Sequence, residues 1–167
     1  MKKQVAVILN QKSWKEYGLD DLRHIPKALR LPEPDMIQAT STEKEAVAVL
    51  EFALGFQQTD SKITIESPIE QIIIQKDKLP HTVEKRLDAR ERYANFIKTT
   101  IFNPLEIWAV QYENGIRHRY IAAYSGDNDI VIMITIEPDG NLFWNFMQRE
   151  SRKMNKQREG ELIYSKI

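Results

Sequence analysis

The chain has 167 residues, of which 42% are apolar and 29% charged, a composition that fits one soluble domain with or without a small appendage. Its 24 basic and 24 acidic side chains balance, which excludes a globally basic nucleic-acid binder but leaves a local anion-binding surface open. The absence of cysteine excludes disulfides and thiolate metal sites and favours a reducing compartment, and no apolar run is long enough to predict a membrane-spanning helix.

The first third of the chain predicts a short strand and one helix. The run QVAVILN (4–10) is typical of a short strand. The segment TEKEAVAVLEFALGF predicts a helix, because Thr42 and Glu45 have the spacing of a capping box and the glycine near its end is a typical stop. We place a boundary after this helix, which divides the chain into an N-terminal segment, 1–59, and a second domain, 60–167.

The second domain opens with strands and continues with a helix. The isoleucine-rich run KITIESPIEQIIIQ (62–75) predicts two short strands or a hairpin, broken at a Ser-Pro pair. An apolar stripe at helical spacing then predicts one long amphipathic helix from about residue 80 to 102, which an Asn-Pro pair ends. The stripe consists of Val83, Leu87, Ala94, Ile97 and Ile101.

Strand-like runs fill the rest of the chain. They cover residues 106–113, 117–125, 129–137, 141–148 and 161–167. Asn114-Gly115 is a strong hairpin signal between the first two, and the almost wholly apolar third run predicts a central strand covered on both faces. The expected fold class is therefore α+β, with one long helix packed on an antiparallel sheet.

Charged side chains gather on one face of the predicted long helix. His81, Lys85, Asp88 and Arg92 share this face, and Arg86 lies beside it. One interpretation is a solvated face laced with ion pairs at i,i+4. The other is a cationic trough, in which histidine exchanges a proton near neutral pH and the arginines stabilise charge on a phosphoryl group. The spacing alone favours the solvated face.

A second basic cluster precedes the last strand. The segment 148–158 carries five basic side chains against one acidic one, and Arg152, Lys156 and Arg158 belong to it. A basic loop and an anion-binding surface are both open interpretations. Tyr164 on the last strand is more often a packing residue than a proton donor, and His118, between two arginines, is expected to be exposed.

Several other chemistries lack their motifs. The chain has no glycine-rich phosphate loop, no paired histidine motif of a zinc enzyme and no nucleophile elbow around a serine. We therefore expect neither a metal site nor a cofactor.

The order of short motifs resembles a known group of nucleases. An isoleucine-rich segment leads to LPH, a helix with ERY, and NPLEIW, and then to RYI, an apolar strand, DG, an aromatic strand and R-x-G-x-L-x-Y. Over roughly 60–167 this order resembles the phage- and polymorphic-toxin-associated nucleases of the barnase–EndoU–colicin E5/D–RelE superfamily. It is most similar to the kind linked to phage Mu-type head morphogenesis proteins.

The resemblance implies a curved antiparallel sheet whose face carries the active site of a metal-independent ribonuclease. In such enzymes the ribose 2′-OH attacks the adjacent phosphate, helped by a base, an acid and cationic groups. Matched by motif, His81 is the implied base or acid, and Arg92 binds the phosphate. Arg158 contributes charge, and Tyr164 positions the substrate or donates a hydrogen bond. The implied substrate-binding residues are Lys85, Arg86, Arg152 and Lys156.

These observations leave three hypotheses. The first is an RNA endonuclease, a toxin or phage-associated effector in the cytoplasm of a bacterial host, which cleaves tRNA or another structured RNA and has an immunity protein or a phage head protein as partner. The second is a catalytically inactive binding or structural module, which the neutral charge favours. The third is another phosphate enzyme, such as a nucleotidyl- or ADP-ribosyl-transferase, whose nucleotide motifs are missing. The first expects the four implied catalytic residues to meet in one concave pocket.

Overall fold

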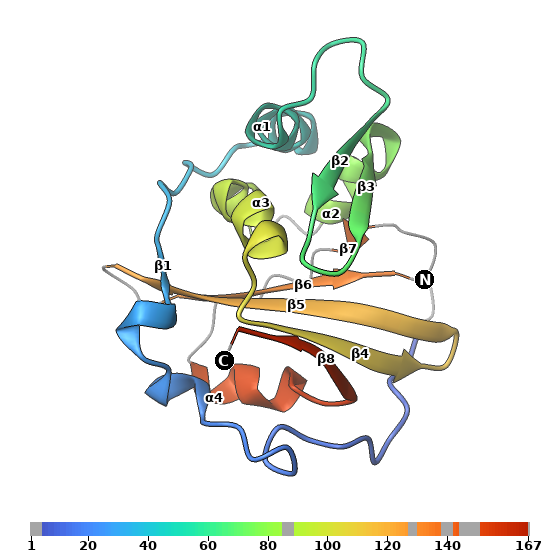
Figure 1. The fold of residues 1–167 in the computed structure, drawn as a ribbon. Helices are drawn as coiled ribbons and strands as arrows, with labels where there is room; N and C mark the ends of the chain where they lie inside the picture. The colour runs from blue at the N-terminus through green and yellow to red at the C-terminus, as the bar shows by residue number, and fades with distance from the viewer. Residues whose placement is uncertain (1–4, 85–88, 127–129, 138–141, 144–150, 167) are drawn as a thin grey trace.

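A computed structural model describes residues 5–84, 89–126, 130–137, 142–143 and 151–166. Its centre is a sheet in the order β7-β6-β5-β4-β8, in which all neighbours are antiparallel (Figure 1). The strands are β4 (Glu106–Tyr112), β5 (Gly115–Ser125), β6 (Val131–Ile136), β7 (Leu142–Phe143) and β8 (Glu161–Ser165). A short strand, β1 (Leu31–Pro32), pairs in parallel with the end of β5, so the whole sheet is mixed rather than purely antiparallel.

The predicted hairpins are confirmed with small shifts. The turn between β4 and β5 consists of Glu113 and Asn114, and Gly115 opens β5 with a φ of 127°, a value that favours glycine. In the predicted strand 4–10, the described residues 5–10 form one bridge, from Val7 to Tyr112, rather than a strand. All residues of β6 are buried, as predicted for a strand covered on both faces, although β5 rather than β6 lies in the middle of the strand order.

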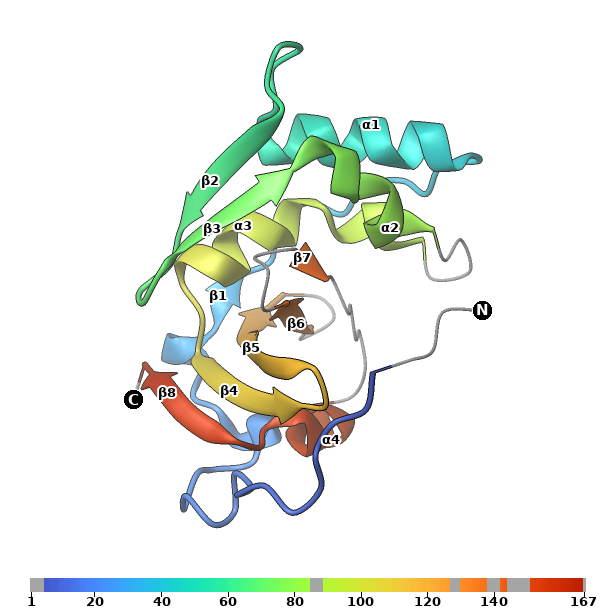
Figure 2. The same ribbon diagram turned by 90° about the vertical axis from the view of Figure 1, so that its right-hand side faces the viewer.

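One face of the sheet is covered by helices and a hairpin. The helices are α1 (Glu43–Leu54), α2 (Leu79–Val83) and α3 (Asn95–Phe102), and the hairpin consists of β2 (Lys62–Glu66) and β3 (Gln71–Gln75). Figures 1 and 2 show these elements stacked over the curved sheet, with the hairpin lying beside α3. Apolar side chains of α1, α3 and the hairpin share one core with Tyr120 and Tyr124 of β5. We call this side of the sheet the α3 face.

The capping signals of α1 work as predicted. Thr42 accepts a hydrogen bond from the backbone N–H of Glu45 at 3.1 Å, and Gly55 ends the helix in the left-handed region with a φ of 82°. Because Leu50 and Leu54 of α1 are packed in the same core as α3, the N-terminal segment contributes to the core of the second domain. The boundary near residue 59 stays a prediction.

The prediction of one long helix over 80–102 is wrong. The described part of this stretch forms the short helix α2, a 3-10 turn η5 (Arg90–Tyr93) and the helix α3. Ala89, directly before the 3-10 turn, has a φ of 41° in the left-handed region, which no residue inside an α-helix adopts. Val83, Ala94 and Ile97 of the predicted apolar stripe are buried, but the stripe is shared by two helices.

The opposite face of the sheet is covered by the described residues before β1 and by the short helix α4 (Ser151–Met154). The 3-10 turns η1 (Leu22–His24) and η2 (Lys27–Leu29) and the turn η6 (Asn155–Gln157) lie on this side (Figure 1). Leu22 and Met154 pack against Trp108 and other residues in a second apolar core. No helix in the described residues is long and apolar enough to cross a membrane.

Candidate active site on the sheet face

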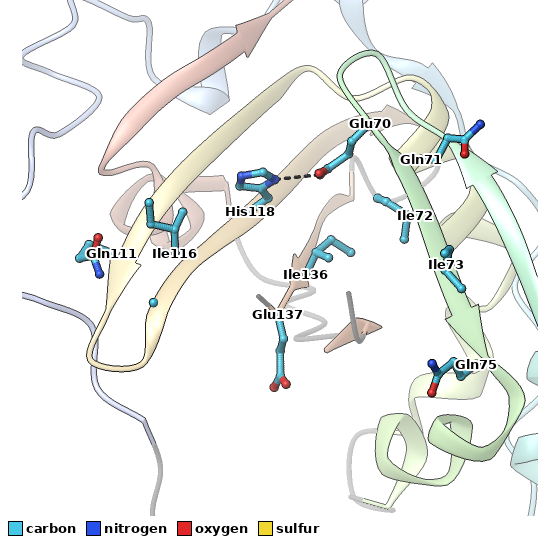
Figure 3. Close-up of a pocket in the computed structure, with 11 residues that line it drawn as sticks. Glu70, Gln71, Ile72, Ile73, Gln75, Gln111, Ile116, His118, Ile136 and Glu137 are labelled. Carbon is cyan, nitrogen blue, oxygen red and sulfur yellow. Dashed lines mark hydrogen bonds and ion pairs between the residues drawn. The ribbon is translucent and has the colours of Figure 1, made fainter. Parts of the chain in front are cut away.

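A cavity of about 740 Å³ lies between the β2–β3 hairpin and the sheet (Figure 3). Strand β3 forms one side of it, and strands β4, β5 and β6 form the other. The lining side chains that can bond to a ligand are Glu70, Gln71, Gln75, Gln111, His118 and Glu137. Ile72, Ile73, Ile116 and Ile136 add apolar walls.

A hydrogen-bonded network centred on Glu70 closes one end of this cavity. The Glu70 carboxylate oxygen Oε1 lies 2.8 Å from Nδ1 of His118 and accepts a hydrogen bond from the hydroxyl of Tyr120 at 2.6 Å. The Tyr120 hydroxyl is also 2.9 Å from Oγ of Ser67. Figure 3 shows His118 and Glu70 reaching toward one another from the sheet and from the hairpin.

Strand alternation and register bring these groups together. Successive side chains of a strand point to opposite faces, so His118 and Tyr120 share the α3 face of β5. His118 pairs with Ala109 of β4, a residue with a small side chain. Glu70 ends the turn between β2 and β3, and its carbonyl accepts a hydrogen bond from the Ser67 N–H at 2.9 Å, which holds the turn over His118.

The network changes the proton affinity of its acidic members. Burial raises the pKa of Glu70, but the hydrogen bonds from His118 and Tyr120 outweigh burial, and the net pKa lies below its usual value. For Tyr120, burial and the hydrogen bond to Glu70 both raise the pKa far above its usual value. Glu70 is therefore an ionised acceptor and Tyr120 a neutral donor near neutral pH.

The geometry suits His118 to proton transfer. The contact with the ionised Glu70 favours the tautomer in which Nδ1 of His118 carries the proton and donates a hydrogen bond to Glu70. In this tautomer Nε2 is an acceptor for a proton. The side chain is 28% exposed, and it lines the cavity. No lysine or arginine of the described residues lines this cavity, whereas the carboxylates of Glu70 and Glu137 do.

The histidine predicted to be catalytic lies on α2. The His81 side chain is 58% exposed, and its Nδ1 is 3.5 Å from the carboxylate of Glu84. Arg92 is exposed on η5, with its guanidinium 5.7 Å from the ring centre of Tyr93. Lys85 and Arg86 lie outside the described residues.

The structure gives Arg158 a different role from the predicted one. Its side chain is 1% exposed and forms a two-pronged ion pair with Glu106, with Nε and Nη2 at 2.7 and 2.6 Å from the carboxylate oxygens. Nη1 donates to the carbonyl of Asp20 and to the side chain of Asn155, and Trp14 stacks at 5.1 Å. A guanidinium so enclosed has no access to a phosphate group, and it joins the N-terminal segment to the sheet.

The other predicted residues have separate positions. Tyr164 lies on the α3 face, because Ile107 pairs with Tyr120 on one side and with Tyr164 on the other. Lys156 is exposed in η6, and Arg152 belongs to α4, with its side chain outside the described part. Five cavities of about 270 to 740 Å³ lie among the described residues, and none of these five is lined by any of the four implied catalytic residues, so the expected convergence is not found in them.

Sequence reasoning missed both members of the His118–Glu70 pair. His118 was expected to be exposed because arginines flank it, yet Arg117 and Arg119 are the buried residues and lie on the opposite face. The available signal was the alternation of β5, which places His118 in phase with Tyr120 and Tyr124. Glu70 offered no such signal, because its contact with His118 crosses 48 residues of chain.

The described residues contain no group of three or more histidine, aspartate or glutamate side chains that could hold a metal ion. Neither a curated protein nor a solved structure matches the chain. A family model described as phage-Barnase-EndoU-ColicinE5/D-RelE like nuclease2 matches residues 49–165, which is well over half of the chain. This match begins inside α1 and includes the whole hairpin, the cavity and the five antiparallel strands of the sheet, but not β1. The chain therefore belongs to this family of phage-associated nucleases.

Proposed function

We propose that the protein is a metal-independent RNA endonuclease whose proton transfers depend on His118. The observation that carries the proposal is the His118–Glu70 pair on the curved sheet face, at the end of a cavity of about 740 Å³. A histidine oriented by a carboxylate is a common arrangement for a general base, because the carboxylate selects the tautomer and stabilises the imidazolium that forms.

In the proposed reaction, Nε2 of His118 takes the proton from a ribose 2′-OH. The 2′ oxygen bonds to the adjacent phosphorus, the bond from phosphorus to the 5′ oxygen breaks, and an acid protonates the leaving oxygen. The products are a 2′,3′-cyclic phosphate and a 5′-hydroxyl. His81 and Tyr164 are the proposed acids. The proposed phosphate-binding side chains are Lys85, Arg86, Arg92, Arg152 and Lys156.

The proposed substrate is tRNA or another structured RNA in a bacterial cytoplasm, with the protein acting as a toxin or phage-associated effector. A neutral protein lacks the general attraction that draws basic nucleases to any RNA. Recognition of a local RNA structure fits this charge better than unspecific degradation.

A second candidate function is a non-catalytic binding module. The observation that favours it is the charge of the cavity, where Glu70 and Glu137 are present and no described lysine or arginine balances a phosphate. Phosphate contacts from cationic side chains supply most of the affinity for RNA.

The chain has three histidines, which allows a matched test. Purified protein and the variants His118→Ala, His81→Ala and His24→Ala are incubated with total tRNA in EDTA. Loss of a general base lowers the rate about 100- to 10,000-fold, so we expect this loss for His118→Ala and no change for His24→Ala, whose histidine is exposed on η1. A comparable loss in His81→Ala identifies the acid.

The cleavage products distinguish the nuclease from the binding module. Fragments that end in 2′,3′-cyclic phosphate, produced in EDTA, support the proposed chemistry. Full cleavage by His118→Ala rejects the proposed base. Intact RNA with all four proteins, over a range of pH and salt, favours the binding module.

A further inference from the structure

Strand β3 has one edge that no strand of the described residues pairs with, and this edge borders the His118 cavity. In the part of the chain that the structure describes, the hairpin is a two-stranded sheet in which β3 pairs with β2 alone. Four of the five residues of β3 line the cavity. Because neighbouring residues of a strand point their side chains to opposite sides, a run of lining residues means that the backbone edge itself faces the cavity.

The register of the hairpin tells which backbone groups point outward. The N–H of Lys76 donates to the carbonyl of Ser61 at 2.8 Å, which marks a hydrogen-bonded pair directly beyond the ladder. In an antiparallel pair, bonded and non-bonded positions alternate. The residues of β3 that direct N–H and C=O away from β2 are therefore Gln71, Ile73 and Gln75. All three line the cavity.

The size of the cavity matches one added strand. A strand of five residues occupies about 800 Å³, from a rise of ~3.4 Å per residue, a strand spacing of ~4.8 Å and a sheet spacing of ~10 Å. The cavity has about 740 Å³. Ile73, which is 43% exposed, and Ile116, which is 51% exposed, offer apolar contacts to alternate side chains of such a strand.

The charge of the cavity selects a basic occupant. Glu70 and Glu137 line it, and no lysine or arginine of the described residues does. Arg117 lies 3.8 Å from Glu137, but on the far side of the sheet from the cavity, and balances that carboxylate only in part. A cavity lined by carboxylates attracts lysine and arginine side chains.

We propose that the free edge of β3 binds an extended segment of a partner protein, which adds to the hairpin as a strand and places basic side chains beside Glu70 and Glu137. Strand addition of this kind takes its affinity from main-chain hydrogen bonds and its specificity from the side-chain pockets beside them. Such a segment covers His118. Binding stands independently of the proposed function, whereas inhibition of RNA cleavage rests on it.

The test measures binding of fluorescent peptides to the full chain by anisotropy. The probe is a short acetylated peptide that alternates lysine and valine. One control peptide replaces lysine by glutamate, and another carries N-methyl groups on alternate amides, which removes the donors of one edge. We expect binding of the lysine peptide, weakened by salt, and no saturable binding of either control.

Two proline variants form a matched pair. Ile73→Pro removes one outward N–H of β3, at a position where the β2–β3 ladder does not need it. Thr64→Pro makes the same change at the residue opposite, on the outer edge of β2. We expect Ile73→Pro to weaken peptide binding at least about fivefold, the effect of one lost hydrogen bond plus the blocking ring, and Thr64→Pro to leave it unchanged. We expect Glu137→Gln to weaken binding of the lysine peptide, and urea denaturation checks that this variant, in which Arg117 loses its ion pair, is folded.

Several outcomes overturn the proposal. Equal binding by both proline variants, or undiminished binding of the N-methylated peptide, rejects strand addition. Equal binding of the glutamate peptide rejects the basic partner. If the protein dimerises with rising concentration and Ile73→Pro abolishes this, the occupant is a second copy of the chain. If no peptide binds and Ile73→Pro loses affinity for RNA, the occupant is RNA. Peptide binding that leaves RNA cleavage intact supports strand addition and rejects only the catalytic role of His118.

Discussion

Arg158 and Glu106 form an ion pair that is closed to solvent, with exposed fractions of 1% and 0%. Removal of one partner leaves a buried charge without compensation, which costs about 3–5 kcal/mol. We therefore predict that Glu106→Gln and Arg158→Met each lower the free energy of unfolding by about this amount, as measured by urea denaturation. The double variant should recover much of the loss.

The Arg158→Met variant also distinguishes a structural role of Arg158 from a catalytic one. RNA cleavage per folded molecule should be unchanged in Arg158→Met under conditions where the variant is folded. A stable variant with strongly reduced cleavage would contradict the structural role and restore the predicted contact with substrate.

Glu70 predicts a pH-dependent contribution to stability. Its pKa in the folded protein lies below the usual 4.5, so its contribution is complete above that pH and is lost as the pH falls through the folded pKa. We expect Glu70→Gln to be less stable than the unmodified protein at about pH 7, with a difference that shrinks toward about pH 3. Urea denaturation at both pH values measures this, with the exposed Glu161→Gln as control. A difference that grows as the pH falls would contradict it.

At the scale of elements, Ala89 interrupts the stripe that α2 and α3 share. A non-glycine residue in the left-handed region is strained by about 1–2 kcal/mol. Glycine relieves this strain, but it also increases the conformational entropy of the unfolded chain, which offsets part of the gain. We predict that Ala89→Gly raises the free energy of unfolding by about 0.5–1 kcal/mol. Thermal and urea denaturation measure this.

A second alanine provides the control. Ala48 is exposed inside α1, where glycine lowers stability by about 1 kcal/mol. Opposite signs for Ala89→Gly and Ala48→Gly support the break before η5. Equal losses at both positions would indicate that a continuous helix forms across residue 89.

At the scale of the whole molecule, the balanced charge predicts a weak salt dependence of RNA binding. A protein that neutralises many phosphates has a steep slope of log K against log salt, close to the number of contacts. With zero net charge and an acidic cavity, we expect a slope of about −1 to −3 between about 50 and 200 mM salt. The variant His118→Ala allows the measurement without cleavage. A slope steeper than about −6 would reveal a large cationic surface.

The sequence by itself determined the elements whose signals are local. The capping box and glycine stop of α1, the break in the β2–β3 hairpin, the turn after β4 and the two-sided burial of β6 all follow from residues a few positions apart. The order of motifs also pointed to the nuclease family that residues 49–165 match.

Only the tertiary structure decided which side chains meet. An apolar stripe is the same for one helix and for two that share a core, so the break at Ala89 was invisible in it. Arg158 resembles a free cation in the sequence, and only its buried contact with Glu106, 52 residues away, removes it from the surface. The pairing of His118 with Glu70 depends likewise on the packing of the hairpin over the sheet, because contacts between distant residues are selected by the whole fold rather than by their neighbours in the chain.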